Sequence, residues 1–255
     1  MKTALEETFQ KGKQKDLYDA WQIAQNLYVK SGGRIRQIIL LTAPTGAGKT
    51  LIITQLIEDI LRGRTPFPRQ EDAIFLWLSD MPDLNEQSKQ KLMYELVPNI
   101  AADKFRTIEA ENFNQRILED GHIYFINTQK LGDKKNLVEK GGGDHRQYTF
   151  WDTMRNTIEE KGKRLFLIID EAHRGTDDNP KEFSKANSIM QKFLKGSPDD
   201  GMPSMPIVIG MSATAERFQE LVKNISGATT QVVEISPEDV RPSGLLKDHI
   251  ELDYS

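Results

Sequence analysis

The stretch "LLTAPTGAGKT", residues 40–50, decides the fold of this 255-residue chain. An apolar run meets a loop of small residues, and apolar positions three and four residues apart then continue to residue 63. A strand that leads through a glycine-rich loop into a helix presents backbone N–H groups and a helix N-terminus to an anion. The stretch therefore predicts a phosphate-binding loop between a buried strand and a helix.

This loop departs at one position from the general pattern G-x-x-x-x-G-K-[ST], because its first residue is Ala43. The mechanism survives the change, since the two glycines let the backbone curl and turn its N–H groups inward. A glycine-rich turn with a chance lysine is the alternative, but strand, loop and helix patterns all agree. We predict that a nucleoside triphosphate binds to Thr45, Gly46, Ala47, Gly48, Lys49 and Thr50.

The rest of the chain alternates apolar runs with helical patterns, and this alternation predicts the fold class. Strands are expected at 36–43, 73–79, 105–111, 122–128, 164–170, 206–214 and 230–235. Helices are expected at 3–30, 48–63, 83–95, 112–119, 148–161, 181–195 and 215–224. Strands that are apolar throughout are typical of a parallel sheet with helices on both faces, so we predict an α/β fold. Residues 130–147 are expected to be a mobile insertion first and a DNA-contacting element second.

Composition narrows the class of protein further. Hydrophobic residues make up 38% and charged residues 28%, which is typical of a globular chain. The chain has no cysteine, no signal-peptide pattern and no apolar run near the roughly 20 residues of a membrane helix. We therefore expect no membrane partner and a cytoplasmic location. The net charge of −4 argues against a charge-driven nucleic-acid binder, but it allows a groove with a few phosphate contacts.

A second motif, "RLFLIIDEAHRG" at residues 164–175, ends an apolar strand in an acidic pair. Asp170 is expected at the carboxyl ends of the parallel strands, where a carboxylate can hold Mg²⁺. Glu171 follows directly and can orient or deprotonate an attacking water. An ordinary strand end with exposed acids is the alternative, but His173, Arg174 and the upstream phosphate loop disfavour it.

A third motif, "GMSAT" at residues 210–214, ends another apolar strand in small hydroxyl residues. Ser212 and Thr214 can hydrogen-bond the acidic motif and respond to the γ-phosphate. The pattern is weak by itself, since Thr214 is also a good helix N-cap. After the other two motifs, and in this order, it supports a site that hydrolyses a nucleotide.

The three motifs A-P-T-G-A-G-K-T, D-E-A-H and S-A-T together resemble the first motor domain of superfamily 2 helicases and translocases. "DEAHRG", "FINTQKL" (125–131) and "VRPSGLLKD" (240–248) resemble more closely the helicase-like Res subunit of type III restriction enzymes. The resemblance covers nearly the whole chain. It implies a RecA-like P-loop NTPase fold, a mainly parallel sheet between helices that binds ATP and Mg²⁺.

The resemblance also implies a role for each matching residue. Lys49 takes phosphate, Thr50 and Asp170 take the metal, and Glu171 takes the attacking water, so that Lys49, Asp170 and Glu171 are the catalytic candidates. Ser212 and Thr214 are expected to couple hydrolysis to movement. His173 looks like the family histidine that contacts a second motor domain, although a lone histidine is more often structural.

Adenine and nucleic-acid contacts are implied by the same resemblance. The family reads adenine with a glutamine upstream of the phosphate loop, and Gln22 is the candidate here, with Gln25 or a merely solvated helix face as alternatives. The segments 77–87 and 127–131 sit where the family places strand-contacting motifs. Candidate contacts to nucleic-acid phosphates, each with an ordinary alternative as a capping or surface residue, are Ser79, Gln87, Thr128, Gln129 and Lys130.

The resemblance divides the chain into three parts. Residues 1–33 are expected to form a helical segment with the adenine-reading glutamine, 34–236 the ATP-binding domain, and 237–255 the start of a linker. In the family, a second RecA-like domain supplies an arginine to the site. The residues that follow Thr214 are too few to form such a domain.

We therefore expect the first half of a DNA-dependent ATPase from a restriction–modification system, slow in hydrolysis and unable to unwind alone. Expected partners are double-stranded DNA through its backbone, the second domain and a modification subunit. A stand-alone nucleotide switch and an RNA-dependent motor stay open as alternatives.

Overall fold

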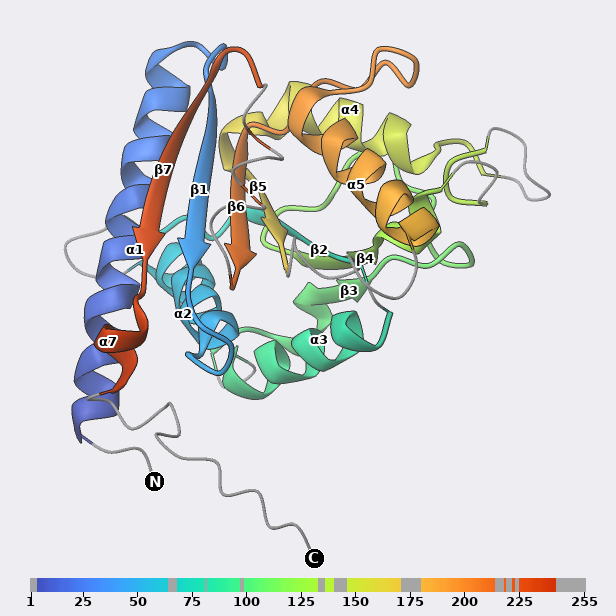
Figure 1. Cartoon of the computed structure of the whole chain (residues 1–255). Helices are drawn as coiled ribbons and strands as arrows, with labels where there is room; N and C mark the ends of the chain where they lie inside the picture. The colour runs from blue at the N-terminus through green and yellow to red at the C-terminus, as the bar shows by residue number, and fades with distance from the viewer. Residues whose placement is uncertain are drawn as a thin grey trace, which may run out of the picture.

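The structure, a computed structural model, describes residues 4–63, 68–80, 82–96, 99–132, 136–139, 146–170, 180–213, 218, 222 and 225–241. Its seven strands form one sheet in which every pairing is parallel, in the order β3-β4-β2-β5-β6-β1-β7 (Figure 1). The strands are β1 (Arg36–Thr42), β2 (Ile74–Ser79), β3 (Phe105–Thr107), β4 (Ile123–Asn127), β5 (Leu165–Ile169), β6 (Ile207–Ser212) and β7 (Ala228–Glu234). The predicted α/β class with a parallel sheet is confirmed.

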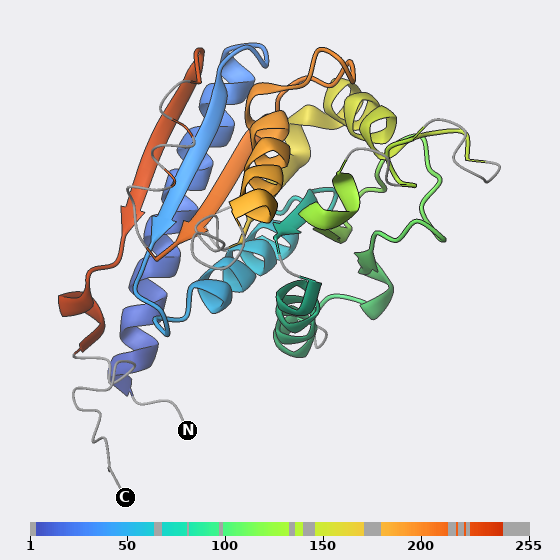
Figure 2. The same cartoon turned by 45° about the vertical axis from the view of Figure 1, so that its right-hand side comes forward.

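Helices cover both faces of this sheet (Figures 1 and 2). One face carries α1 (Ala4–Lys30), α2 (Lys49–Arg62) and α3 (Pro82–Leu96), and the other carries α4 (Phe150–Lys161) and α5 (Pro180–Lys195). The short elements are η1 (Ala102–Lys104), η2 (Thr128–Leu131), η3 (Gly162–Arg164) and α7 (Pro237–Val240). None of the helices in the described ranges is long and apolar enough to cross a membrane.

The central strands read as unbroken apolar runs because both of their faces are buried. In β1, Ile39 and Leu41 pack with α1 and α2, while Ile38 and Leu40 pack with the α4 and α5 side. All four side chains are at most 3% exposed. Successive residues of a strand point to opposite faces, so a strand inside a three-layer fold needs apolar residues at both parities.

The first helix runs antiparallel to the strand beside it. Lys13 Nζ donates to the carbonyl oxygen of Glu234, at the carboxyl end of β7, at 3.3 Å. The Gln231 side chain, in the middle of β7, donates to the carbonyl oxygen of Ala20 at 3.2 Å. The start of α1 therefore lies at the carboxyl end of the sheet, and its later residues lie toward the amino end.

A helix expected at 112–119 is absent, and the segment is irregular. Its polar groups bond outside the segment or in local turns: the Leu118 N–H donates to Thr157 Oγ1 at 3.0 Å, and Asn114 Oδ1 accepts from the Gln147 N–H. Side chains that compete for backbone groups favour such turns over helix. The expected strand at 105–111 is likewise only three residues long, as β3.

Residues 130–132, 136–139 and 146–147 of the expected insertion at 130–147 are described, and residues 133–135 and 140–145 lie outside the described ranges. Leu137 is 2% exposed, and its carbonyl oxygen accepts from the Phe150 N–H at 2.7 Å. Arg146 donates to the carbonyl oxygen of Asn136 at 2.7 Å. The described residues 136–139 are therefore bonded to the start of α4 and to Arg146.

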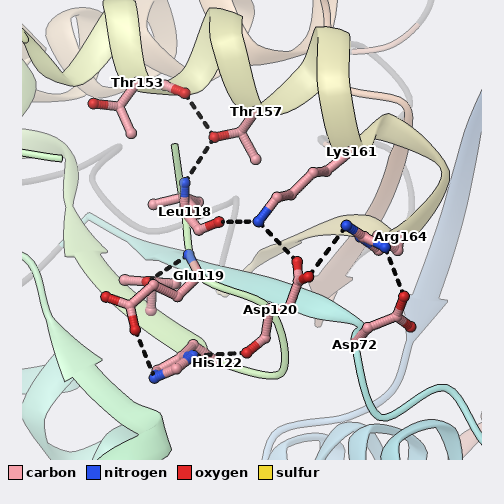
Figure 3. A network of polar contacts seen from close by, with 10 residues as sticks. Asp72, Leu118, Glu119, Asp120, His122, Thr153, Thr157, Lys161 and Arg164 are labelled. Atoms are coloured by element: carbon pink, nitrogen blue, oxygen red, sulfur yellow. Dashed lines mark hydrogen bonds and ion pairs between the residues drawn. The ribbon is translucent and has the colours of Figure 1, made fainter. Parts of the chain in front are cut away.

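A network of ion pairs closes the amino ends of three strands (Figure 3). Asp120 accepts from Lys161 at 2.8 Å and lies 3.2 Å from an Arg164 nitrogen, and Arg164 reaches Asp72 at 2.7 Å. Asp72, Asp120 and Arg164 come just before β2, β4 and β5. The network therefore links the amino ends of these three strands.

Candidate nucleotide site

The phosphate loop follows β1 and is held by backbone bonds. The Ala43 N–H donates to the carbonyl oxygen of Ser212 at 3.1 Å, and the Ala47 N–H donates to that of Pro44 at 3.1 Å. Gly46 and Gly48 have φ of 87° and 81°, in the left-handed region that side chains rarely adopt. The loop therefore needs glycine at these two positions, whereas Ala43 continues the strand and needs none.

Lys49 and Thr50 form the first turn of α2, the helix that leaves this loop. Lys49 Nζ donates to the carbonyl oxygens of Ala43 and Pro44 at 2.9 and 3.2 Å. The ammonium group thus lies over the loop backbone. A positive charge, a helix N-terminus and a curled backbone are placed together, and this combination favours an anion.

Sheet order brings the three motifs to one edge. In the register, Ser212 of β6 pairs with Thr42 of β1, and Gly210 pairs with Ile169 of β5, directly before Asp170. The carboxyl ends of β1, β6 and β5 therefore lie side by side. Glu171, His173 and Thr214 lie outside the described residues, so the structure neither places them nor tests their roles.

Asp170 is buried, with 8% of its surface exposed, and its backbone N–H extends the ladder to the Leu78 carbonyl oxygen. Its Oδ2 accepts a hydrogen bond from Trp77 Nε1 at 3.3 Å and another from Ser88 Oγ at 2.9 Å. Sequence reasoning did not identify Trp77 and Ser88, because β2 and α3 are distant from Asp170 along the chain. A carboxylate fixed in this way suits a hard cation such as Mg²⁺.

Gln22 is not brought together with the phosphate loop. It follows Ala20, which lies level with the middle of β7, and α1 continues from there toward the amino end of the sheet. Gln25 lies farther in that direction, where it bonds to Gln70 and to the carbonyl oxygen of Lys163. The position of Gln22, chosen from sequence spacing, gives no support to an adenine-reading role. Gln14 follows Lys13, which bonds to the carboxyl end of β7, so it lies at the same end of the sheet as the phosphate loop. Gln14 is 8% exposed.

The nucleic-acid candidates separate by exposure. Ser79 is the last residue of β2, and Thr128 directly follows the neighbouring strand β4. Each is 1% exposed, so their side chains face the interior. Lys130 is ion-paired with Glu109. Gln87 and Gln129 are exposed, and they are the two candidates whose side chains are open to a partner. No group of three or more metal-ligating side chains occurs in the part of the chain described.

A parallel sheet with a glycine-rich loop after β1 and a buried aspartate after β5 is typical of the RecA-like P-loop NTPase fold. The chain belongs to the family described as type III restriction enzyme, res subunit, whose model matches residues 4–217. No curated protein matches the chain.

Solved helicase structures resemble the chain weakly. The helicase domain of Pyrococcus furiosus Hef is 19% identical over 86% of this chain and 39% of its own, with a TM-score of 0.41. The DUF1998 helicase MrfA bound to DNA is 19% identical over 88% and 27%, with a TM-score of 0.44. Dbp5 of S. cerevisiae bound to RNA and ADP BeF3 is 15% identical over 77% and 41%, with a TM-score of 0.42. The chain thus spans about two-fifths or less of these proteins, and likenesses this weak carry no information on function.

Proposed function

We propose that this chain binds ATP with Mg²⁺ and is the first motor domain of a DNA-dependent ATPase of a restriction system. One observation carries the proposal: the phosphate loop, Asp170 and Ser212 lie at the carboxyl ends of adjacent parallel strands. In open α/β sheets this edge is where ligands bind. Family membership over residues 4–217 supports the same class of activity.

The residues present fit the proposed ligands. The left-handed Gly46 and Gly48 shape a cradle for phosphate, and Lys49 supplies a positive charge over it. Thr50 and Asp170 offer a hydroxyl and a carboxylate, which are hard oxygen ligands for Mg²⁺. Bound Mg²⁺ would neutralise charge on the β and γ phosphates.

The chain's own residues then have separate tasks in hydrolysis. Lys49 would offset the negative charge of the β and γ phosphates, including the charge that develops on the leaving β-phosphate oxygen as its bond to the γ-phosphorus breaks. Glu171 would accept a proton from the attacking water. Ser212 and Thr214 would couple hydrolysis of the nucleotide to movement of the protein. We propose that a second RecA-like domain, double-stranded DNA and a modification subunit act with this chain in the complete protein.

The experiment is steady-state ATP hydrolysis by this chain and by a version extended through a second motor domain, each with and without double-stranded DNA. Fast, DNA-stimulated hydrolysis by the extended version alone is expected. Fast hydrolysis by this chain that is indifferent to DNA would favour a stand-alone nucleotide switch. Stimulation by duplex RNA but not DNA would replace the proposed partner with RNA.

A further inference from the structure

The side chain of Asp170 is held by two donors that come from other elements of the fold. Trp77 on β2 and Ser88 on α3 both donate to the same carboxylate oxygen, Oδ2. The three side chains are 0%, 7% and 8% exposed. Trp77 and Ser88 are 93 and 82 residues from Asp170 along the chain, so the arrangement depends on the tertiary fold.

The chemistry of the three groups fixes the direction of these bonds. The indole N–H only donates, and an ionised carboxylate only accepts, so the Ser88 hydroxyl must also donate its hydrogen to Asp170. Burying a carboxylate is costly unless hydrogen bonds compensate for lost water. Two donors on one oxygen stabilise the negative charge and restrict rotation of the carboxylate. A metal ligand benefits from both effects.

Helix α3, which carries Ser88, packs on the face of the sheet to which Trp77 points. Leu92 and Leu96 of α3 belong to the core cluster that also contains Trp77. Gln87 directly precedes Ser88 and is exposed. In α3, the exposed Gln87 is therefore adjacent to Ser88, which bonds to Asp170, the candidate metal ligand.

We propose that Trp77 and Ser88 are positioning residues for Asp170, and that Ser88 couples the affinity of the site for Mg·nucleotide to the stability of α3. The inference rests on the proposed function, because Asp170 needs to be a metal ligand for positioning to matter. Coupling of this kind is reciprocal: if α3 favours binding, then binding stabilises α3.

The first test measures the affinity for a non-hydrolysable ATP analogue, with Mg²⁺ and with EDTA. Ser88→Ala and Trp77→Phe are each expected to weaken Mg²⁺-dependent binding by roughly 10- to 100-fold, as loss of a hydrogen-bond partner of a metal ligand does. Binding in EDTA is expected to stay within about twofold. A merely structural role would weaken both measurements together.

Two control variants match these changes. Trp21→Phe removes another buried indole, whose Nε1 has no hydrogen-bond partner among the described residues. Gln90→Ala changes an exposed position on α3, two residues beyond Ser88. Both controls are expected to keep the parent's Mg²⁺-dependent affinity. A fall in the controls equal to that in the test variants would overturn the positioning role.

The second test follows hydrogen–deuterium exchange of α3 with and without the Mg·analogue. Slower exchange is expected on binding in the parent and in Gln90→Ala, and this protection is expected to be lost in Ser88→Ala at saturating analogue. Equal protection in Ser88→Ala would overturn the coupling. If the parent binds no analogue, the proposed function itself fails; if it binds but the variants behave like the parent, only the present inference fails.

Discussion

Lys49 Nζ lies 2.9 Å from the carbonyl oxygen of Ala43, the residue at the first position of the phosphate loop. The ammonium group is therefore directed back over the loop from the first residue of α2. Carbonyl oxygens are neutral acceptors, and an ionised phosphate makes shorter and stronger bonds to an ammonium group. A bound triphosphate is expected to replace these carbonyl contacts with little rearrangement of the loop.

Replacing Lys49 with alanine is therefore expected to weaken nucleoside triphosphate binding by roughly 10- to 100-fold, because the phosphates lose a charged donor. Isothermal titration with an ATP analogue measures the effect. Lys15→Ala is the control, since Lys15 forms a surface ion pair with Asp19 on α1. Unchanged affinity in Lys49→Ala would show that the nucleotide does not use this loop.

Glu171→Gln is expected to separate binding from hydrolysis. Glutamine keeps the size of the side chain but is a poor base, so analogue affinity should stay within about threefold of the parent. Residual ATP hydrolysis should fall by roughly a hundredfold or more, in line with loss of general-base catalysis. Single-turnover hydrolysis alongside titration makes the comparison, and parent-rate hydrolysis by Glu171→Gln would refute the assignment of the base.

The sheet and the loop were predictable because local patterns determine them. Ile38, Ile39, Leu40 and Leu41 form an unbroken apolar run, as a strand buried on both faces requires. The positive φ of Gly46 and Gly48 likewise follows from a tight turn that opens a helix. The parallel α/β fold was confirmed for these reasons.

The remaining features depend on contacts that no local pattern encodes. The irregular segment that contains Leu118 is bonded to Thr157 on α4, which is distant along the chain. The hydrogen bonds from Trp77 and Ser88 to Asp170 depend on how β2 and α3 pack. Gln22 was chosen by counting residues along the chain, but α1 runs antiparallel to the strands and carries it away from the loop. Glu171, His173 and Thr214 lie outside the described residues, and their roles stay predictions.

The turn after α5 gives a stability prediction that depends on pH. Burial alone would raise the pKa of the Asp200 carboxyl, but hydrogen bonds from Ser197 and Lys192, at 2.5 and 2.9 Å, outweigh burial and lower that pKa from its ordinary value. A lowered pKa in the folded state stabilises the protein above the unfolded-state pKa, and this stabilisation is lost as pH falls through the folded value.

Asp200→Asn is therefore expected to lower the free energy of unfolding by about 1 kcal/mol at pH 7, a difference that shrinks below about pH 4. Urea unfolding at pH 7, 5, 4 and 3 measures it. Asp199→Asn makes the same charge change at the exposed neighbouring position and is expected to be nearly neutral. A deficit in Asp200→Asn that is constant from pH 7 to 3 would contradict the linkage.

Gly121 provides a test of the sheet's other end, away from the nucleotide site. It lies between Asp120 and His122, two residues of the polar network in Figure 3. Its φ is 70°, and an added Cβ would lie 2.6 Å from the carbonyl oxygen of Glu71. Backbone cannot move aside as a flexible side chain can, so Gly121→Ala is expected to cost about 2–4 kcal/mol of unfolding free energy.

Gly12 in α1 makes the comparison sharp, because a Cβ there would meet nothing within 4 Å. Gly12→Ala is expected to stabilise the protein by up to about 1 kcal/mol, since alanine loses less backbone freedom in a helix. Urea unfolding of both variants separates the gain that alanine brings to any compatible site from the strain specific to Gly121. At temperatures where Gly121→Ala stays folded, its affinity for the ATP analogue should equal the parent's, because the network lies at the amino ends of the strands and the phosphate loop at the carboxyl ends. A neutral Gly121→Ala would show that the turn before β4 can open without disturbing the sheet.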